Sequence, residues 1–421
     1  MRINRPRSSY DFHPLRISRV TDCDVLVVGG GPAGASTAAL AARAGLRVLL
    51  VERAVFPRHK ACAEYLSPEA SRDLEALGVL EEVEAAGAAR LTGFRLVSDD
   101  GAAAVGRFAS SHRYTPFRPY GLALPRTTLD LIVLGAAIRS GAQVRQGVAV
   151  ERLLVERGAV RGAVVRDGRR RKEIRARAVV GADGLNSIVA RTLGLARWGS
   201  PRRLALVAHL EDVAGMADYG EMFAGDGRYV GIAPIGGGRV NVAAVVPDTD
   251  AELIAGDATA FFRSQLDRVP ELRRRFAGAR VVRRVMVTGP FARGTRRAAV
   301  DGALLVGDAA DFFDPFTGEG IFAALRGGAL AADALAAALA RGEATREALR
   351  PYTAARRRAF LSKWVLERVV ALGATRPSLM RRFTRQLSRR TGVADLWVGA
   401  AGDFVPVRAL FDPRNLAALV R

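Results

Sequence analysis

Three glycines at fixed spacing, Gly29, Gly31 and Gly34, follow an apolar segment at 25–28 and open a run of small residues. The first glycine permits a tight turn, the second lets a pyrophosphate approach the backbone, and the third lets a helix pack on the strand. The N-terminus of that helix offers N–H groups and the positive end of its dipole to phosphates. The next apolar segment ends at Glu52, where an acid accepts hydrogen bonds from a ribose. This spacing predicts a dinucleotide site, and its expected contacts include Pro32, Ala33 and Arg53.

Two later apolar segments also end in a glycine and an aspartate. One runs from 178 to Asp183-Gly184, and the other runs from 303 to Gly307-Asp308. The second continues as Ala-Ala-Asp-Phe-Phe-Asp-Pro-Phe-Thr-Gly-Glu-Gly-Ile. Together with the glycine motif, these segments resemble the FAD-dependent oxidoreductases of the p-hydroxybenzoate hydroxylase superfamily, over residues 22–345.

The resemblance implies a noncovalently bound FAD and assigns residues to it. Asp308 would hold the ribitol chain, and residues 315–320 would bring backbone N–H groups to the pyrimidine end of the flavin. Arg126 would lie near the pyrophosphate, the backbone of Val150 would meet the adenine, and Asp183-Gly184 would lie beside both FAD and a passing nicotinamide. NAD(P)H is the expected electron donor, bound transiently, since a second G-x-G-x-x-G is absent from the sequence. The implied FAD-binding residues beyond the glycine motif are Lys60, Arg126, Val150, Asp183, Gly184, Gly307, Asp308, Pro315, Gly318, Gly320 and Ile321.

The segment after Glu52 carries the candidate catalytic residues, Cys62 and Glu64. It reads Phe-Pro-Arg-His-Lys-Ala-Cys-Ala-Glu from residue 56 and resembles the Lys-x-Cys-Gly segment of geranylgeranyl reductases, with Ala63 in place of the glycine. Cys62 is either a thiol that tunes the flavin beside basic residues or a small buried filler. Glu64 is either a proton donor or substrate-orienting group, or a carboxylate packed on a positive neighbour. No metal is expected, because the sequence shows no Cys/His cluster at ligand spacing.

The family resemblance leaves the reaction open between classes. Residues 229–234 lack both tryptophans of the flavin-dependent halogenases, and Asp311 replaces the histidine usual in aromatic hydroxylases. These departures favour the geranylgeranyl-reductase-like branch, whose members include oxygenases. The first expectation is an NAD(P)H- and O2-dependent monooxygenase acting on a hydrophobic small molecule or a carrier-bound metabolite. The alternatives are a reductase of isoprenoid-type C=C bonds and a non-enzymatic flavin-bound interaction protein.

The chain is strongly basic, with 64 Lys and Arg against 42 Asp and Glu. Residues 346–390 hold 13 Lys and Arg and two acids. This region is either a solvated helical cap or a docking surface for an acyl carrier protein or an anionic membrane. Nucleic acid is not an expected partner, because no binding motif is present. Neither a signal peptide nor an apolar run of about 18 residues is expected, so we predict a cytoplasmic protein, with membrane association left open.

The elements that must position these residues form a discontinuous pattern. We predict an α/β fold in which a Rossmann-like FAD-binding domain carries an inserted antiparallel-sheet substrate domain and a helical C-terminal region. Strand–helix alternation marks the first part, and short alternating strands mark the second. The predicted ranges are 1–20 for a flexible arm, 21–90, 120–200 and 295–345 for the FAD-binding domain, 91–119 and 201–294 for the substrate domain, and 346–421 for the helical region.

Overall fold

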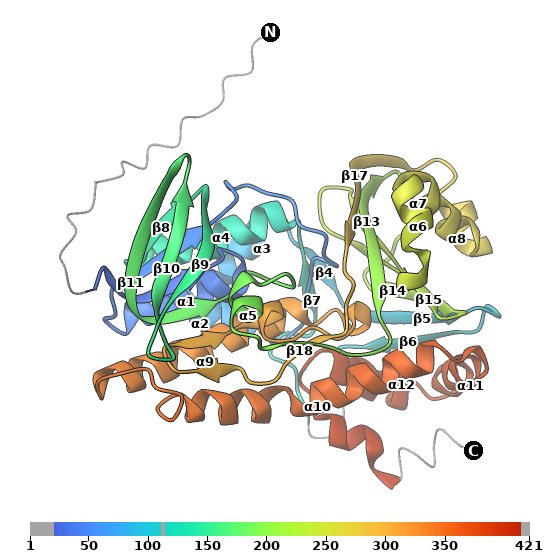
Figure 1. Cartoon of the computed structure of the whole chain (residues 1–421). Coiled ribbons are helices and arrows are strands. Elements are labelled where there is room, and N and C mark those ends of the chain that lie inside the picture. The colour runs from blue at the N-terminus through green and yellow to red at the C-terminus, as the bar shows by residue number, and fades with distance from the viewer. Residues whose placement is uncertain (1–20, 111–113, 414–421) are drawn as a thin grey trace.

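The computed structural model describes residues 21–110 and 114–413, so the predicted arm at 1–20 and the last eight residues lie outside the described part. Figure 1 shows two sheet-based layers side by side, with long helices along their lower edge. One layer holds the glycine motif, and the other lies opposite it.

The first layer is built on a largely parallel sheet in the order β19-β20-β11-β1-β2-β8. β1 pairs in parallel with both β11 and β2, so the glycine motif after β1 lies at the carboxyl edge of the sheet. β9 and β10 continue β11 as an antiparallel extension. The strands are β1 (Cys23–Val28), β2 (Val48–Glu52), β8 (Gln143–Gln146), β9 (Val148–Glu156), β10 (Ala159–Asp167), β11 (Arg170–Gly181), β19 (Ala299–Val300) and β20 (Ala303–Leu305).

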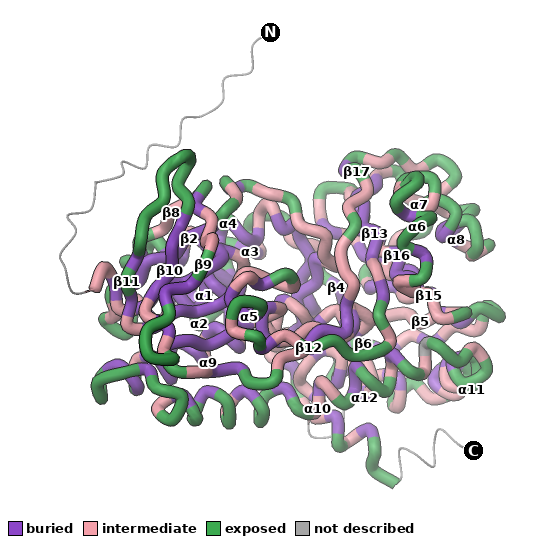
Figure 2. The backbone as a smooth tube through the Cα atoms, viewed as in Figure 1, coloured by how far each residue is buried: buried purple, intermediate pink, exposed green. Residues whose placement is uncertain are grey.

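Both faces of this sheet are covered, which explains why β1 reads as an uninterrupted apolar run. Val25 and Val27 pack on helices α1, α4 and α9, whereas Leu26 and Val28 pack on β9, β10 and α5. In Figure 2 the strands and helices at the centre of this layer are coloured as buried. The helices of this layer are α1 (Pro32–Arg43), α2 (Ala70–Ala76), α3 (Leu80–Ala85), α4 (Arg126–Arg139), α5 (Ile188–Thr192) and α9 (Gly320–Ala340).

The second layer is a seven-stranded sheet in the order β17-β13-β16-β15-β14-β5-β6, antiparallel except for the β14–β5 pair. Residues alternate between its faces: Leu206 and Ala208 pack on α7 and α8, and Ala205 and Val207 face the other way. Its elements are β5 (Gly93–Ser98), β6 (Ala103–Arg107), β13 (Arg203–Glu211), β14 (Gly220–Gly225), β15 (Arg228–Pro234), β16 (Val240–Pro247), α6 (Ala251–Gly256), α7 (Ala258–Asp267), α8 (Pro270–Arg275) and β17 (Arg280–Thr288).

Short strand pairs and the C-terminal helices join the two layers. β3 (Tyr65–Leu66), β7 (Gly121–Ala123) and β4 (Ala89–Leu91) form one small sheet, and β12 (Ala196–Trp198) pairs with β18 (Arg293–Thr295). α11 (Pro377–Ser388) and α12 (Thr391–Ala401) pack on β5 and β6, and α10 (Arg350–Ala374) lies beside α9. The predicted fold class is confirmed. The domain boundaries stay predictions, and β4 crosses the expected one between residues 90 and 91.

Helix α9 is the element to compare with the expectation that the chain has no long apolar segment. It spans 21 residues with a mean hydropathy of 1.5 and, among the described helices, is the one long and apolar enough to cross a membrane. Its apolar window includes Arg326 and Asp333, and 56% of that window is buried inside the protein. The helix is therefore compatible with the expectation of no uninterrupted apolar run of about 18 residues, because Arg326 and Asp333 interrupt it. In the fold, α9 is the core helix that packs on α1.

Candidate active site

A cavity lies between the carboxyl edge of the first sheet and the inner face of the second. The β1–α1 turn, the 60–63 segment and the 307–324 region line one side, and β13, β15 and β16 line the other. α10 contributes its inner face. Ligands bind at this edge of open α/β sheets. The predicted residues that line the cavity are Gly31, Pro32, Ala33, Lys60, Cys62, Arg126, Gly184, Gly307, Asp308, Pro315, Gly318, Gly320 and Ile321.

The glycine motif opens toward this cavity at one position. A Cβ on Gly29 would lie 2.5 Å from the Ala182 carbonyl oxygen, and a Cβ on Gly34 would lie 1.9 Å from the Gly29 carbonyl oxygen. These two positions therefore admit only glycine. At Gly31, by contrast, the nearest atoms to a Cβ would be guanidinium nitrogens of Arg58, at 3.5 Å, and Arg126, at 3.8 Å. The space above Gly31 is thus bounded by two cations, as a pyrophosphate would require.

A buried carboxylate fixes those two cations. The Arg126 Nε and Nη2 atoms donate to Asp130 at 2.6 and 2.8 Å, and Arg58 Nη1 lies 3.0 Å from Asp130 Oδ2. Burial alone would lower the pKa of Arg126, but Asp130 and Cys62 raise it above its ordinary value. Sequence reasoning missed Asp130, although its place four residues after Arg126 on one helix is ion-pair spacing.

Glu52, the expected ribose acceptor, lies beside the glycine turn at the end of β2. Its carboxylate is buried and accepts hydrogen bonds from the backbone N–H groups of Gly30, at 2.7 Å, and Ala54, at 2.8 Å. These bonds hold the acid against the glycine turn. The side chains of Arg53 and Val150 lie elsewhere, Arg53 exposed and Val150 half-buried on β9 against the far face of the sheet. The predicted residues that do not line the cavity are Gly29, Gly34, Glu52, Arg53, Glu64, Val150 and Asp183.

The 314–320 loop is held rigidly at the start of α9. Asp314 accepts hydrogen bonds from Phe316 N at 3.0 Å and from the Tyr229 hydroxyl at 2.6 Å, and it also pairs with buried Arg203. Gly318 has φ 73°, which favours glycine, and a Cβ there would lie 2.9 Å from the Tyr65 ring. The loop therefore directs the N-terminus of α9 into the cavity. A helix N-terminus stabilises negative charge, such as that of a reduced flavin ring.

Side chains of the second sheet anchor the Cys62 segment. Asn241 Nδ2 donates to the Cys62 carbonyl oxygen at 3.1 Å, and His209 Nε2 lies 2.8 Å from Glu64 Oε2. The other Glu64 oxygen accepts from Arg126 N at 3.1 Å, and Glu64 has φ 59°. The second sheet and the start of helix α4 thus fix the segment, with Cys62 on the cavity lining and Glu64 behind it. Sequence reasoning missed the roles of His209 and Asn241, whose only signal was a polar residue within an apolar strand.

Comparison with known proteins agrees with this geometry. A family model described as an FAD binding domain matches residues 22–365. The chain belongs to this family of FAD-dependent oxidoreductases. It is 31% identical over 339 residues to a digeranylgeranylglycerophospholipid reductase of Methanosarcina acetivorans, covering 77% of this chain and 78% of that protein. It is 32% identical over 327 residues to a menaquinone reductase of Mycobacterium tuberculosis, covering 74% and 76% respectively.

A solved structure supports the same fold for this FAD-dependent oxidoreductase. A geranylgeranyl bacteriochlorophyll reductase-like protein from Thermoplasma acidophilum superposes with a TM-score of 0.72 at 23% identity, covering 93% of this chain and 98% of that one. The predicted membership of the p-hydroxybenzoate hydroxylase superfamily and of its geranylgeranyl-reductase-like branch is confirmed. No cluster of three or more His, Cys, Asp or Glu side chains that could hold a metal occurs within residues 21–110 and 114–413.

The two aspartates of the FAD-dependent oxidoreductase differ in their surroundings, so their replacement should differ in effect. Asp308 lines the cavity and lies 3.2 Å from Lys60 Nζ, whereas Asp183 Oδ2 accepts a hydrogen bond from Ile188 N at 2.6 Å behind it. Burial raises the pKa of Asp183. We expect Asp308→Ala to weaken FAD retention by roughly 1–3 kcal/mol and Asp183→Ala to weaken it less. Flavin released from the two purified variants measures this, and equal occupancy would contradict the ranking.

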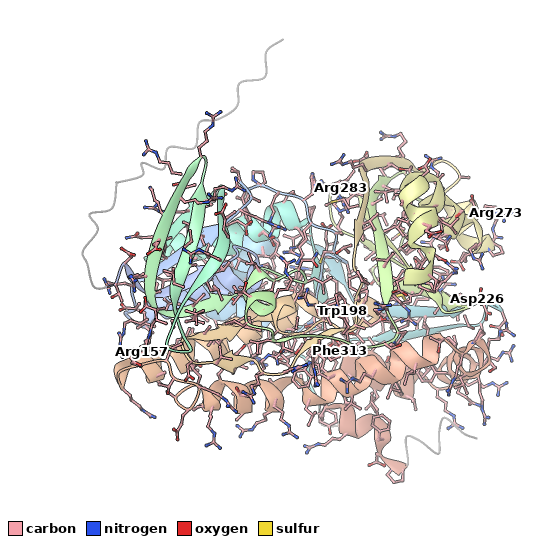
Figure 3. The ribbon with its side chains drawn as sticks, viewed as in Figure 1. Arg157, Trp198, Asp226, Arg273, Arg283 and Phe313 are labelled. Atoms are coloured by element: carbon pink, nitrogen blue, oxygen red, sulfur yellow. The ribbon has the colours of Figure 1, made fainter. Side chains whose placement is uncertain are left out.

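Arg283 is a buried charge that the oxidoreductase leaves unpaired. It lies across from His209 on β17, is 6% exposed, and its guanidinium nitrogens have no hydrogen-bond partner among the described residues. Figure 3 labels Arg283 on the side of the second layer that faces the first. Burial lowers the pKa of Arg283, and Glu64 and Cys62 oppose this shift only in part.

Replacing an unpaired buried charge by an apolar side chain of similar length should stabilise the fold. We expect Arg283→Met to increase the free energy of unfolding by about 1–3 kcal/mol. Arg203 is the control, because it is also buried but pairs with Asp314, so Arg203→Met should destabilise. Urea denaturation of both variants tests this contrast. A loss of stability in Arg283→Met would show that the guanidinium has a partner in solution.

Proposed function

We propose that this oxidoreductase reduces a carbon–carbon double bond of an isoprenoid-type hydrophobic molecule. The observation that carries this proposal is the apolar part of the cavity lining, to which the second sheet, the 307–324 region and α10 all contribute. An isoprenoid chain offers only apolar surface and gains free energy on burial in such a lining. The apolar side chains that line it are Ala205, Val207, Met222, Ile232, Ala233, Val245, Phe291, Phe312, Phe316 and Phe360.

The comparisons favour this reaction over the monooxygenase that the sequence first indicated. Both curated relatives are named reductases, and one name specifies a digeranylgeranyl lipid while the other specifies a menaquinone. Each of those names contains an isoprenoid-bearing molecule. The family membership alone does not separate the two reactions, so oxygenation becomes the second outcome of the test below.

Saturation of a double bond needs a hydride at one carbon and a proton at the other. The chemistry that FAD supplies when bound is hydride transfer from its reduced form. Of the two candidate catalytic residues, Cys62 is the one that lines the cavity, and Arg126 interacts with its sulfur. We assign the proton to the Cys62 Sγ–H group, which would donate it to the second carbon. The Arg126 guanidinium would then lie beside the resulting thiolate. Glu64, bound by His209 and the Arg126 N–H, then acts as a positioning residue for the segment.

A single-turnover experiment without oxygen tests the reaction. The purified protein is reduced with dithionite, freed of excess dithionite and mixed with a geranylgeranyl lipid, and the product mass is measured. We expect a gain of two hydrogens per reduced bond, together with reoxidation of the flavin. A product formed only in air and carrying an atom from labelled O2 would instead establish the monooxygenase. NAD(P)H remains the proposed electron donor, and its ability to bleach the flavin in the same apparatus tests that part separately.

The proposed role of Cys62 makes a prediction that separates chemistry from packing. We expect Cys62→Ser to lower the reduction rate by about tenfold or more, because a serine hydroxyl is a much weaker acid, while stability changes little. Cys23 is the matched control: it is buried on β1, and burial raises its pKa to about 12. Cys23→Ser should lose roughly 1–3 kcal/mol of stability and keep its rate. An unchanged rate with a lowered melting temperature in Cys62→Ser would remove this cysteine from the chemistry.

A further inference from the structure

Helix α10 carries a stripe of exposed aliphatic side chains. Leu361, Val365, Val369 and Leu372 are 46%, 43%, 43% and 54% exposed, respectively. Their spacing of four, four and three residues places them on one line along the helix. Exposed aliphatic residues are common singly, but a continuous line of them along a helix marks an interaction surface.

A groove lined by seven arginines adjoins this stripe. The groove lies between α10, the 296–299 segment and the 407–411 turn (Val407–Phe411), and Leu361, Val365 and Phe411 form its apolar part. None of the described residues that line it is acidic. Figure 3 shows many nitrogen-tipped side chains directed away from the molecule along this lower edge. The arginines are Arg296, Arg297, Arg346, Arg350, Arg357, Arg358 and Arg408.

The opposite face of α10 belongs to the active-site cavity. Phe360, Lys363, Trp364 and Glu367 line that cavity, one helix thickness from the exposed stripe. An α-helix with its side chains is about 10 Å across. Figure 2 shows the outer side of α10 as an exposed edge of the molecule, so a surface bound there would lie close to the cavity.

We propose that this face, the α10 stripe together with the arginine groove, docks on an anionic lipid bilayer. Aliphatic residues in a line with arginines beside them are the pattern of a helix that lies in the membrane interface. Each arginine near an anionic leaflet adds attraction that salt screens. The length of the stripe favours a bilayer over a compact acidic protein, because four exposed aliphatic positions along three helical turns match a plane. The proposal does not depend on the reaction proposed above.

Vesicle flotation of the full FAD-loaded chain tests the docking. We expect the protein to float with phosphatidylglycerol/phosphatidylcholine vesicles, to stay unbound with phosphatidylcholine alone, and to be released by high salt. Arg357→Glu/Arg358→Glu and Leu361→Asp/Val365→Asp should each lower the partition coefficient at least tenfold. The flavin spectrum and melting temperature of each variant confirm that it is folded, and because the changes are at exposed sites, activity toward a detergent-solubilised substrate should persist.

Matched changes elsewhere complete the test. Arg169→Glu/Arg170→Glu alters charge equally on the exposed β10–β11 turn, and Leu253→Asp introduces an acid at a leucine that is 65% exposed on α6. Both controls should bind as the unaltered protein does. Equal loss in the charge control would show that net charge alone drives binding and would overturn the docking face. Dimerisation that is abolished by Leu361→Asp/Val365→Asp, without vesicle binding, would make the face a contact between copies and would also overturn it.

Discussion

Lys363→Met is expected to destabilise the protein by about 3–5 kcal/mol, the cost of leaving a buried carboxylate without its cation. Lys363 Nζ lies 2.8 Å from Glu319 Oε2 and 4.0 Å from Glu367 Oε1, and it donates to the Glu319 carbonyl oxygen at 2.9 Å. Burial would lower the pKa of Lys363, but Glu319, Asp403 and Glu367 raise it above its ordinary value. Chemical denaturation of the variant measures the loss.

Lys172→Met is the matched control for this loss. Lys172 lies 3.9 Å from Asp167, and both side chains are almost half exposed, so its removal should cost at most about 1 kcal/mol. Lys363 also holds the 314–320 loop through Glu319, so the Lys363 variant should release FAD more readily, whereas the Lys172 variant should not. A similar, small loss in both variants would show that water already solvates the cluster around Lys363.

The same variant has a pH dependence whose sign follows from burial. Burial raises the pKa of Glu319, and Lys363 opposes that rise. Without Lys363, Glu319 must bind a proton on folding, so the folded state binds more protons than the unfolded state between a pH of about 4.3 and the raised pKa of Glu319 in the folded state. The stability deficit should therefore be small in acid and should grow as the pH rises through the pKa of the folded state. A deficit that does not change with pH would place its origin in packing rather than in the uncompensated charge.

The cofactor site was largely predictable because its residues are close in sequence to a glycine motif with strict spacing. Gly29 and Gly34 are fixed by backbone contacts within one strand–turn–helix unit, and Glu52 ends the next strand. Asp308 and Gly184 also follow strands of the same parallel sheet, whose carboxyl ends must meet at one edge. The position of each strand end could thus be read from apolar runs without knowing the second sheet.

The contacts between the two layers could not be predicted in this way. His209 meets Glu64, and Asn241 meets the Cys62 carbonyl, across more than a hundred residues of sequence. These contacts depend on the pairing register of β13 and β16. The alternation of apolar residues along each strand does not determine that register. The Glu319–Lys363 pair joins the 314–320 loop to α10. Because the whole C-terminal region is basic, its composition did not distinguish Lys363 as a buried lysine.

The second large effect is expected from a single methyl group on Gly31. This residue has φ −70° and ψ 179°, a conformation open to any L-residue, and a Cβ there would meet only the two guanidinium groups at ordinary contact distance. Gly31→Ala should therefore fold normally without cofactor. The methyl group would occupy the space through which a pyrophosphate approaches the backbone, so FAD affinity should fall by about tenfold to a hundredfold, or roughly 1.4–2.7 kcal/mol.

Gly34→Ala is the control variant for the Gly31→Ala prediction. A Cβ on Gly34 would overlap the Gly29 carbonyl oxygen, so that variant should lose stability with or without FAD. Melting temperatures of the two apoproteins, followed by titration of each with FAD, separate the two effects. If Gly31→Ala binds FAD as tightly as the unaltered chain, the pyrophosphate does not pass over this residue. The cations of Arg58 and Arg126 would then need another explanation, because Asp130 alone supplies one negative charge for the two of them.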